Sequence, residues 1–386
     1  MIKLAIVTTH PIQYYAPLFK LLTERGRIEV KVFYTWEQAQ RSQYDPGFGK
    51  TVAWDIPLLE GYAYAFVKNT ARQPGSHHFR GIINSTLPRE VENWGADALL
   101  VFGWSYHSHL RAMRYFKGRI PVFFRGDSTL LDEQPYTKRL LRKVMLTWVY
   151  RHVDTALYVG QNNRAYYLEY GLKPSQLAFV PHAVDNQRFQ QSETETGQVA
   201  SAWRASLGID EDETVFLFVG KLEPKKNPVL LLEAFKRLGP ARAHLLFVGN
   251  GVLEPELKRS GTANVHFIDF QNQARMPTAY RLGDVFVLPS KGPGETWGLA
   301  VNEAMACGLP ILVSDKVGCT VDLVTDGRNG YVFRSENVDQ LSEKMRLLLS
   351  RTERTDQGRA SRQLIEYWSL EVASERLEKA MVDSNG

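Results

Sequence analysis

Residues Ser290–Pro310 read S-K-G-P-G-E-T-W-G-L-A-V-N-E-A-M-A-C-G-L-P, and no other part of the chain is as informative. Apolar runs stand on either side of it, at Val285–Leu288 and Ile311–Val313. A strand, a glycine-rich loop, a helix and a strand in this order form a ligand-binding unit. The unpaired backbone N–H groups of the loop and of the helix start are a natural phosphate seat. Glu295 and Glu303 flank that seat, where we expect their carboxylates to accept hydrogen bonds from sugar hydroxyls.

Short apolar runs alternate with helix-length amphipathic segments along the whole chain. This pattern predicts an α/β protein with parallel sheets covered by helices on both faces. The expected strands of the first half are Leu4–Val7, Val30–Tyr34, Ala98–Phe102, Val122–Phe124 and Thr155–Val159. Those of the second half are Val215–Val219, His244–Val248, Val265–Ile268, Val285–Leu288, Ile311–Val313 and Tyr331–Phe333.

The 386 residues are enough for two doubly wound domains, each with its own core. The polar stretch Gln190–Gly197 has no apolar period and predicts a linker or exposed loop. We therefore expect a first domain over residues 1–189, a second over 190–360 and a terminal helical segment over 361–386. Ligands of such sheets bind beyond the carboxyl ends of the strands, so a cleft between the two domains is the expected active site.

The composition is that of a water-soluble globular protein, with 44% hydrophobic and 23% charged residues. The two cysteines, Cys307 and Cys319, argue against a disulfide framework and favour the cytoplasm. We also expect no signal peptide, because the first strand begins at once. The excess of basic residues lies in the first half, which has 24 Lys and Arg against 15 Asp and Glu through Arg188. It indicates either an anionic partner, such as a phosphorylated acceptor or a membrane surface, or ordinary solvated surface.

The second half supplies cations near the expected phosphate seat. Val215–Val219 is followed by G-K-L-E-P-K-K-N-P, which puts Gly220, Lys221 and Lys226 in a loop at the carboxyl end of that strand. Two ammonium groups there would neutralise a diphosphate and stabilise it as a leaving group, although a plain surface turn is the alternative. The glycine turn Gly249-Asn250-Gly251 follows the next expected strand, His244–Val248. Phe270 follows the strand after it, where it either packs near a base or fills the core.

The first half has polar residues after two of its expected strands. His10 and Gln13 follow the first strand, and Arg125, Asp127 and Ser128 follow Val122–Phe124. We expect His10, Gln13, Arg125 and Asp127 to face an acceptor, with Asp127 also a candidate catalytic group. The segments Gln73–Arg80 and Trp104–His109 carry four more histidines. Their spacing does not suggest a metal site, so we expect no metal.

Thr137–Arg151 predicts a basic amphipathic helix with Leu140, Leu141, Val144, Met145 and Trp148 on one side. The favoured interpretation is an ordinary helix that packs on its apolar side and turns a basic face to solvent. Peripheral contact with an anionic membrane, at its inner face, is the alternative.

Taken together, these motifs resemble the retaining glycosyltransferases classed as family 4. E-T-W-G-L-A-V-N-E-A-M-A-C-G-L-P is similar to their E-x7-E signature, and V-G-K-L-E-P-K-K-N-P is similar to their donor-phosphate loop. V-G-N-G, D-V-F-V-L-P-S and V-P-H-A-V-D-N-Q-R-F occur in the expected order, so the resemblance covers nearly the whole second domain. The first domain departs from the pattern, because its first loop reads T-T-H-P-I-Q and Asp127 stands where many members have histidine.

The resemblance implies a GT-B fold of two facing Rossmann-like domains, with a nucleotide-sugar donor, a UDP- or GDP-sugar, held by the second. It implies that Lys221 and Lys226 hold the diphosphate, that Glu295 contacts the transferred sugar, and that Glu303 contacts the ribose. Backbone N–H groups around Gly298, Leu299 and Ala300 would complete the phosphate site. The family needs no metal ion or other cofactor, and its last helix crosses back to the first domain.

We therefore expect a retaining glycosyltransferase that acts on a glycan, lipid-linked or small-molecule acceptor in the synthesis of bacterial glycans, glycolipids or glycoconjugates. A nucleotide-sugar epimerase, a phosphorylase-like enzyme and a non-catalytic sugar-nucleotide-binding protein are the alternatives. A dinucleotide oxidoreductase is disfavoured, because no G-x-G-x-x-G follows the first strand. We expect no nucleic-acid partner, since only the charge would support one.

Overall fold

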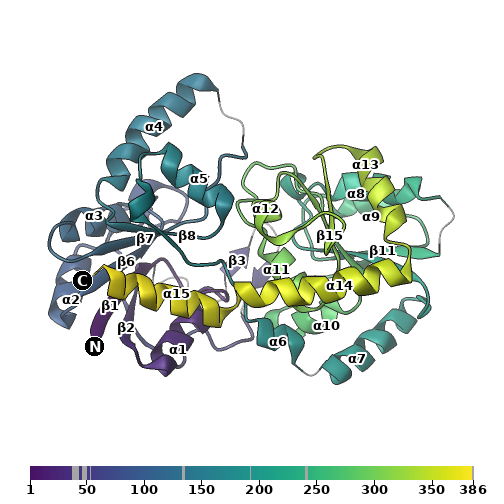
Figure 1. The fold of residues 1–386 in the computed structure, drawn as a ribbon, viewed down its shortest axis with the longest axis horizontal. Coiled ribbons are helices and arrows are strands. Elements are labelled where there is room, and N and C mark those ends of the chain that lie inside the picture. The colour runs from purple at the N-terminus through teal and green to yellow at the C-terminus, as the bar shows by residue number, and fades with distance from the viewer. Residues whose placement is uncertain are drawn as a thin grey trace. The chain divides into compact units, whose positions relative to one another are not determined.

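The computed structural model describes residues 1–36, 43–45, 50–52, 54–132, 135–191, 193–239 and 242–384. The chain divides into two compact units, each built on its own parallel sheet (Figure 1). Unit 1 comprises residues 1–43, 57–182 and 370–386, and unit 2 comprises residues 44–56 and 183–369. The predicted organisation into two α/β units is confirmed. The chain enters the second unit at Ala183, however, rather than at residue 190.

Unit 1 has a seven-stranded sheet in the order β5-β2-β1-β6-β7-β8-β9, in which the paired strands are parallel. Its strands are β1 (Ile2–Thr8), β2 (Ile28–Tyr34), β5 (Ala63–Phe66), β6 (Ala98–Phe102), β7 (Val122–Arg125), β8 (Thr155–Tyr158) and β9 (Leu177–Phe179). Its helices are α1 (Ala16–Arg25), α2 (Leu87–Trp94), α3 (His107–Phe116), α4 (Tyr136–Tyr150), α5 (Gln161–Glu169) and α15 (Leu370–Asp383), with short 3-10 turns at Phe79–Gly81 and Pro174–Gln176.

All five strands predicted for the first half are present, whereas the edge strands β5 and β9 were not predicted. Both are short apolar segments, A-Y-A-F and L-A-F, whose residues are half-buried or exposed at the edges of the sheet. A further pair, β3 (Gln43–Asp45) and β4 (Lys50–Val52), forms a separate two-stranded sheet.

Unit 2 has a six-stranded parallel sheet in the order β12-β11-β10-β13-β14-β15. The strands are β10 (Thr214–Val219), β11 (Ala243–Val248), β12 (Val265–Ile268), β13 (Val285–Leu288), β14 (Ile311–Ser314) and β15 (Gly330–Phe333), all of which the sequence predicts. The helices are α6 (Asn186–Gln190), α7 (Glu193–Ser206), α8 (Pro228–Arg237), α9 (Glu254–Ser260), α10 (Met276–Tyr280), α11 (Leu299–Ala306), α12 (Thr320–Leu323), α13 (Val338–Leu347) and α14 (Arg351–Ile365). Short 3-10 turns lie at Pro224–Lys226, Gln273–Arg275 and Glu366–Trp368.

The order of these strands creates a switch point between β10 and β13. The chain runs outward from β10 to β11 and β12, then returns to β13 on the other side of β10. The loops that follow β10 and β13 therefore diverge at the carboxyl edge of the sheet, where open parallel sheets bind their ligands.

Two helical predictions were wrong in detail. Most of the expected linker is helical, because α6 extends to Gln190 and α7 begins at Glu193. The expected terminal helix is two helices, since α14 ends at Ile365 and Ser369 is extended before α15 begins. Only α15 belongs to unit 1, where it packs on α1 and Arg25 forms a two-pronged ion pair with Glu378, at 2.8 and 2.9 Å.

Helix α4 confirms the predicted amphipathic helix but not its favoured orientation. Leu146, Val149 and Tyr150 are its buried residues, whereas the apolar stripe predicted to pack is exposed along its whole length. The favoured interpretation is therefore wrong about which side packs, whereas the exposure of Arg139 and Lys143, at 58% and 51%, agrees with a basic face turned to solvent.

Candidate functional site

Three loops meet at the carboxyl edge of the unit 2 sheet, after β10, β11 and β13. Their close packing depends on glycine, because a Cβ on Gly249 would lie 2.1 Å from the carbonyl oxygen of Gly220. A Cβ on Gly251 would lie 2.4 Å from the carbonyl oxygen of Leu222. Gly249 also has φ +135°, which a residue with a side chain rarely adopts. The predicted glycine turn thus brings two loops into backbone contact beside the switch point.

Lys226 and Glu295 join the loops on the two sides of the switch point. Lys226 Nζ donates a hydrogen bond to Glu295 Oε2 at 2.7 Å, and both side chains are largely buried. The Ser290 hydroxyl donates to the same carboxylate oxygen at 3.1 Å. The backbone joins the loops as well, since Lys291 N–H donates to the carbonyl oxygen of Lys225 at 2.9 Å. The structure therefore brings the predicted lysine and the predicted acid into direct contact.

The charge on Glu295 is maintained by these neighbours. Burial by itself would raise the pKa of this carboxyl group, but the Lys226 ammonium, Lys225 and the Ser290 hydroxyl outweigh burial. The pKa of Glu295 is consequently held below its ordinary value, and the group is an anion at neutral pH. As an ionised carboxylate it accepts hydrogen bonds and donates none.

Helix α11 points its start into the same edge of the sheet. Gly298 is its N-cap with φ +94°, and a Cβ there would lie 2.8 Å from Val317 Cγ1. Leu299 and Ala300 form the first turn and are half-buried. Since the first N–H groups of a helix have no partner within it, this turn offers donors and a partial positive charge to an anion. The predicted glycine, helix start and Glu295 thus lie within one short loop-helix segment.

Glu303 lies deeper than the sequence indicates. It is 2% exposed, and its Oε2 accepts a hydrogen bond from the Tyr280 hydroxyl at 2.7 Å. Tyr280 is the last residue of α10 and is itself buried, so this contact holds the Glu303 carboxylate in a fixed position within unit 2. A ribose contact of Glu303 stays a prediction.

The remaining predicted donor-side residues are also at this edge. Lys221 and Gly220 follow β10, and both are half-buried. Phe270 follows β12, and its N–H donates to Asn250 Oδ1 at 2.9 Å. Asn250 in turn donates to Asp269 Oδ1 at 3.0 Å, which ties the β11 and β12 loops together. Ser290, Asn250 and Tyr280 were not among the predicted site residues. The available signals were Ser290 and Asn250, two polar residues that each stand two positions after a strand.

The predicted acceptor-side residues of unit 1 are in different environments. His10 is exposed and contacts Thr9 Oγ1 at 2.9 Å, whereas Gln13 and Asp127 are half-buried. Arg125 is 3% exposed, and its guanidinium donates to the carbonyl oxygens of Val180 and Pro181, both at 2.9 Å. These contacts give Arg125 a structural role that joins β7 to the segment after β9. An acceptor contact of any of the four stays a prediction.

The other histidines of unit 1 also differ from one another. His109 is fully buried, lies 2.9 Å from Thr35 Oγ1, and hydrogen-bonds the Phe102 carbonyl, so it has a structural role. His107 instead lines a surface groove of unit 1. In the part of the chain that the structure describes, no three His, Cys, Asp or Glu side chains are grouped to hold a metal ion.

Comparisons with known proteins relate most of unit 2 to one family model. Residues 199–364 match the family described as glycosyl transferases group 1. The chain is 36% identical over 177 residues to D-inositol 3-phosphate glycosyltransferase 2 of Catenulispora acidiphila, covering 42% of this chain and 39% of that protein. It is 31% identical over 256 residues to a GDP-mannose-dependent monoacylated alpha-(1-6)-phosphatidylinositol monomannoside mannosyltransferase of Corynebacterium glutamicum, covering 63% of this chain and 64% of that protein. The matched stretches thus span less than two thirds of these relatives.

Solved structures extend the likeness to the whole chain at the level of fold. The Anabaena protein Alr3699/HepE in complex with UDP has a TM-score of 0.74 at 16% identity, covering 99% of this chain and all of that one. A glycosyltransferase involved in lipopolysaccharide biosynthesis, WaaG, has a TM-score of 0.68 at 17% identity, covering 98% and 99%. The fold is therefore GT-B, with two Rossmann-like α/β sheets, as the sequence predicts.

Proposed function

We propose that this protein, whose residues 199–364 match the group 1 glycosyl transferases, transfers a sugar from a nucleoside-diphosphate donor to an acceptor hydroxyl with retention of configuration. The observation that carries the proposal is the contact between Lys226 and Glu295, 2.7 Å apart at the switch point of the unit 2 sheet. A cation for a diphosphate and an anion for sugar hydroxyls stand side by side there, next to the start of α11.

The diphosphate is the leaving group of this reaction, and its developing negative charge needs stabilisation. Lys226, Lys221 and the N–H groups of Leu299 and Ala300 supply positive charge and donors for it. An ammonium group has three N–H donors, so Lys226 can keep Glu295 and still bind a phosphate oxygen. With these groups in place we expect no metal ion to be needed.

Glu295 and Glu303 would orient the donor. We assign Glu295 to the hydroxyls of the transferred sugar, because its carboxylate is ionised and held by Lys226 and Ser290. We assign Glu303 to the ribose hydroxyls, with Tyr280 as the residue that positions its carboxylate. Both assignments use a carboxylate as an acceptor for two neighbouring hydroxyl groups.

The transfer itself exchanges one C–O bond for another. The bond between the sugar and the diphosphate breaks, and the acceptor oxygen bonds to the same carbon from the face that the diphosphate leaves. The acceptor proton passes to the departing diphosphate oxygen, so no separate protein nucleophile is required. We place His10, Gln13 and Asp127 on the acceptor side.

The names of similar proteins suggest which nucleoside diphosphate the donor sugar carries. One relative is named as GDP-mannose-dependent, and the Anabaena structure is a complex with UDP, so we propose a UDP- or GDP-sugar donor. The acceptor would be a glycan, a lipid-linked sugar or a small molecule in bacterial glycan or glycolipid synthesis. We propose that the reaction takes place in the cytoplasm.

A thermal-shift panel of UDP-, GDP- and ADP-sugars tests the donor site. A donor present at 100 times its dissociation constant should stabilise the native protein by about 2.7 kcal/mol. The panel is repeated with Lys226→Met and Glu295→Gln, which should lose the shift, and with EDTA, which should leave it intact. Acceptor-dependent release of nucleoside diphosphate then tests transfer. Full transfer by both variants would contradict the proposal.

A further inference from the structure

Helix α4 turns its apolar stripe away from the body of unit 1. Leu140, Val144 and Trp148 follow one another at intervals of four residues, and Leu141 and Met145 do the same beside them. Leu141 is 72% exposed, Val144 is 68% exposed and Leu140 is 52% exposed. A helix of a soluble protein normally buries such a stripe, so this surface is expected to meet an apolar partner.

The basic residues of α4 lie along its flank beside α5, where the side chains of Arg139 and Lys143 remain 58% and 51% exposed. Arg142 donates to the Tyr166 hydroxyl at 2.9 Å, and Arg139 and Lys143 pair with Glu169 at 3.2 and 3.4 Å. These contacts fasten the polar side of α4 to helix α5. Together with the buried side chains of Leu146, Val149 and Tyr150, these contacts hold the helix with its apolar stripe exposed.

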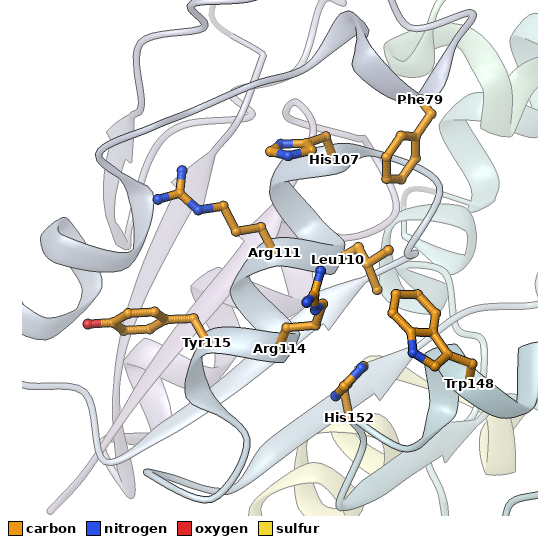
Figure 2. A pocket seen from close by; sticks show the side chains of 8 residues that line it. All are labelled: Phe79, His107, Leu110, Arg111, Arg114, Tyr115, Trp148 and His152. Carbon is orange, nitrogen blue, oxygen red and sulfur yellow. The ribbon is translucent and has the colours of Figure 1, made fainter.

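A groove of about 810 Å³ lies beside the stripe, between α3 and the end of α4 (Figure 2). Trp148 and His152 line one side of it and Arg111 and Arg114 line the other, with the Arg114 guanidinium 5.5 Å from the centre of the Trp148 ring. Two ring nitrogens of the groove, His107 Nδ1 and His152 Nε2, are buried and hydrogen-bond to none of the described residues. The groove thus contains an aromatic ring, two arginines and two histidine nitrogens that can form hydrogen bonds with a ligand.

The charge around the stripe and the groove is mainly positive, although Glu169 pairs with α4 and Glu92 accepts a hydrogen bond from the groove residue Tyr115. Helices α3 and α4 contain no Asp or Glu, and neither Arg111 nor Arg114 forms an ion pair within the part of the chain that the structure describes. After burial, the largest influence that lowers the pKa of His107 and of His152 is a neighbouring arginine. The groove is therefore at positive potential and would favour an anion.

We propose that the α4 stripe and the α3–α4 groove together form a docking surface for a bilayer that contains anionic phospholipid. The apolar side chains of α4 would enter the region between head groups and acyl chains, and Arg111 and Arg114 would contact lipid phosphates. Trp148 lies at the junction of the two, as an amphipathic ring does at a membrane interface. No helix among the described residues is long and apolar enough to cross a bilayer, so the contact would be peripheral.

A lipid surface fits this chemistry better than the other occupants. A second copy of the chain related by two-fold symmetry would place the same cations against each other, with no acid on α3 or α4 to offset them. A nucleic acid would leave the aliphatic stripe of Leu140, Leu141 and Val144 in water. The inference does not rest on the proposed glycosyl transfer, because it concerns unit 1 alone.

Sedimentation with vesicles tests the proposal. The full chain is mixed with phosphatidylcholine vesicles with and without phosphatidylglycerol, and we expect binding to the anionic vesicles. Leu141→Ser combined with Val144→Ser should lower the partition coefficient by roughly tenfold or more for each side chain. Arg111→Gln combined with Arg114→Gln should lower it by about fivefold for each arginine.

The matched control combines Val252→Ser with Val321→Ser, since these valines are 70% and 61% exposed in unit 2. This control should bind as the natural sequence does. The proposal is overturned if the natural sequence does not bind anionic vesicles, or if the α4 variant binds them undiminished. It is also overturned if sedimentation in solution shows a dimer that the α4 variant loses, because the stripe would then serve self-association. None of these readouts uses donor turnover, so a failure here is separate from a failure of the proposed transfer.

Discussion

Lys226 Nζ lies 2.7 Å from Glu295 Oε2, although the two residues are 69 positions apart in the sequence. The contact exists because β10 and β13 are neighbours in the unit 2 sheet, so the loops that follow them begin side by side. The same contact holds the pKa of Glu295 below its ordinary value against the opposing effect of burial. The strand order of unit 2 thus determines that Glu295 lies beside Lys226, and this contact keeps the Glu295 carboxylate ionised.

The first prediction separates stability from function at this pair. Lys226→Met leaves the Glu295 carboxylate largely buried without its cation, and it should lower the free energy of unfolding by about 3 kcal/mol. Adding Glu295→Gln should restore most of that loss, because the uncompensated charge is then gone. Neither variant should transfer sugar. Denaturant unfolding and acceptor-dependent release of nucleoside diphosphate measure the two effects, and an active double variant would contradict the assigned roles.

The second prediction concerns pH. Because the pKa of Glu295 is lower in the folded protein, its ionised form stabilises the fold at pH values above the ordinary 4.5. This contribution is lost as the pH falls from 4.5 through the lowered pKa. The difference in unfolding free energy between the natural sequence and Glu295→Gln should therefore be largest near neutral pH and shrink in acid. Urea titrations across this range measure it, and a constant difference would show that the ionisation of Glu295 contributes nothing.

The third prediction concerns Gly249. In Gly249→Ala the new Cβ would lie 2.1 Å from the Gly220 carbonyl oxygen, so the two loops must separate. Gly208→Ala is the control, since Gly208 also has a positive φ, +73°, but nothing lies within 4 Å of its Cβ position. The control should lose about 1 kcal/mol of stability, and Gly249→Ala should lose more and also bind donor more weakly. Equal losses in unfolding and equal donor affinities would rule out a role for this close approach.

The fourth prediction concerns Arg125 in unit 1. Arg125→Met removes two hydrogen bonds to the carbonyl oxygens of Val180 and Pro181 and should cost about 2–4 kcal/mol of stability. Donor binding should not change, because Arg125 belongs to unit 1. Arg89→Met, at an exposed position of the same unit, should change stability by less than about 0.5 kcal/mol. If Arg125→Met unfolds as the natural sequence does but transfers slowly, Arg125 contacts the acceptor after all.

Much of unit 2 is predictable from sequence because its strands are interior and its site loops follow them directly. Gly220, Lys226, Gly249 and Glu295 all stand within seven residues of the end of a continuous apolar run, which indicates their place at one edge of the sheet. Sequence does not predict which of them touch. The pairing of Lys226 with Glu295 depends on the order of the strands, and the contact of Tyr280 with Glu303 depends on how α10 packs.

In unit 1 the sequence predicts helix α4 but not the side on which it packs. The period of α4 predicts an apolar stripe, but the stripe alone does not say whether it faces the protein or the solvent. The orientation depends on how the folded helix is packed. Leu146, Val149 and Tyr150 are buried, and Glu169 and Tyr166 of α5 contact its basic residues. The edge strand β5 was also missed, because a four-residue apolar segment, A-Y-A-F, does not by itself indicate that it pairs with the edge of a sheet.

The last prediction tests whether Glu303 binds ribose or only completes the core. Its carboxylate is 2% exposed and accepts a hydrogen bond from the Tyr280 hydroxyl at 2.7 Å. If it also accepts from a ribose hydroxyl, a nucleoside diphosphate should bind better than its 2′-deoxy analogue by roughly 10- to 100-fold, since a hydrogen bond to a charged group contributes about 1.5–3 kcal/mol. Glu303→Gln should lose most of this preference. Tyr280→Phe should reduce it in part, because the carboxylate would keep its charge but lose the donor that positions it.

Calorimetric titration of the two ligands into each variant measures the preference, and thermal unfolding is recorded alongside it. Both substitutions disturb a buried contact, so each should lower stability by about 1–3 kcal/mol whatever the role of Glu303. The ratio of the two affinities is the quantity that a purely structural role would not move. A ratio in Glu303→Gln equal to that of the natural sequence would assign Glu303 to the core alone, and would leave Lys226, Glu295 and the start of α11 as the groups that hold the donor.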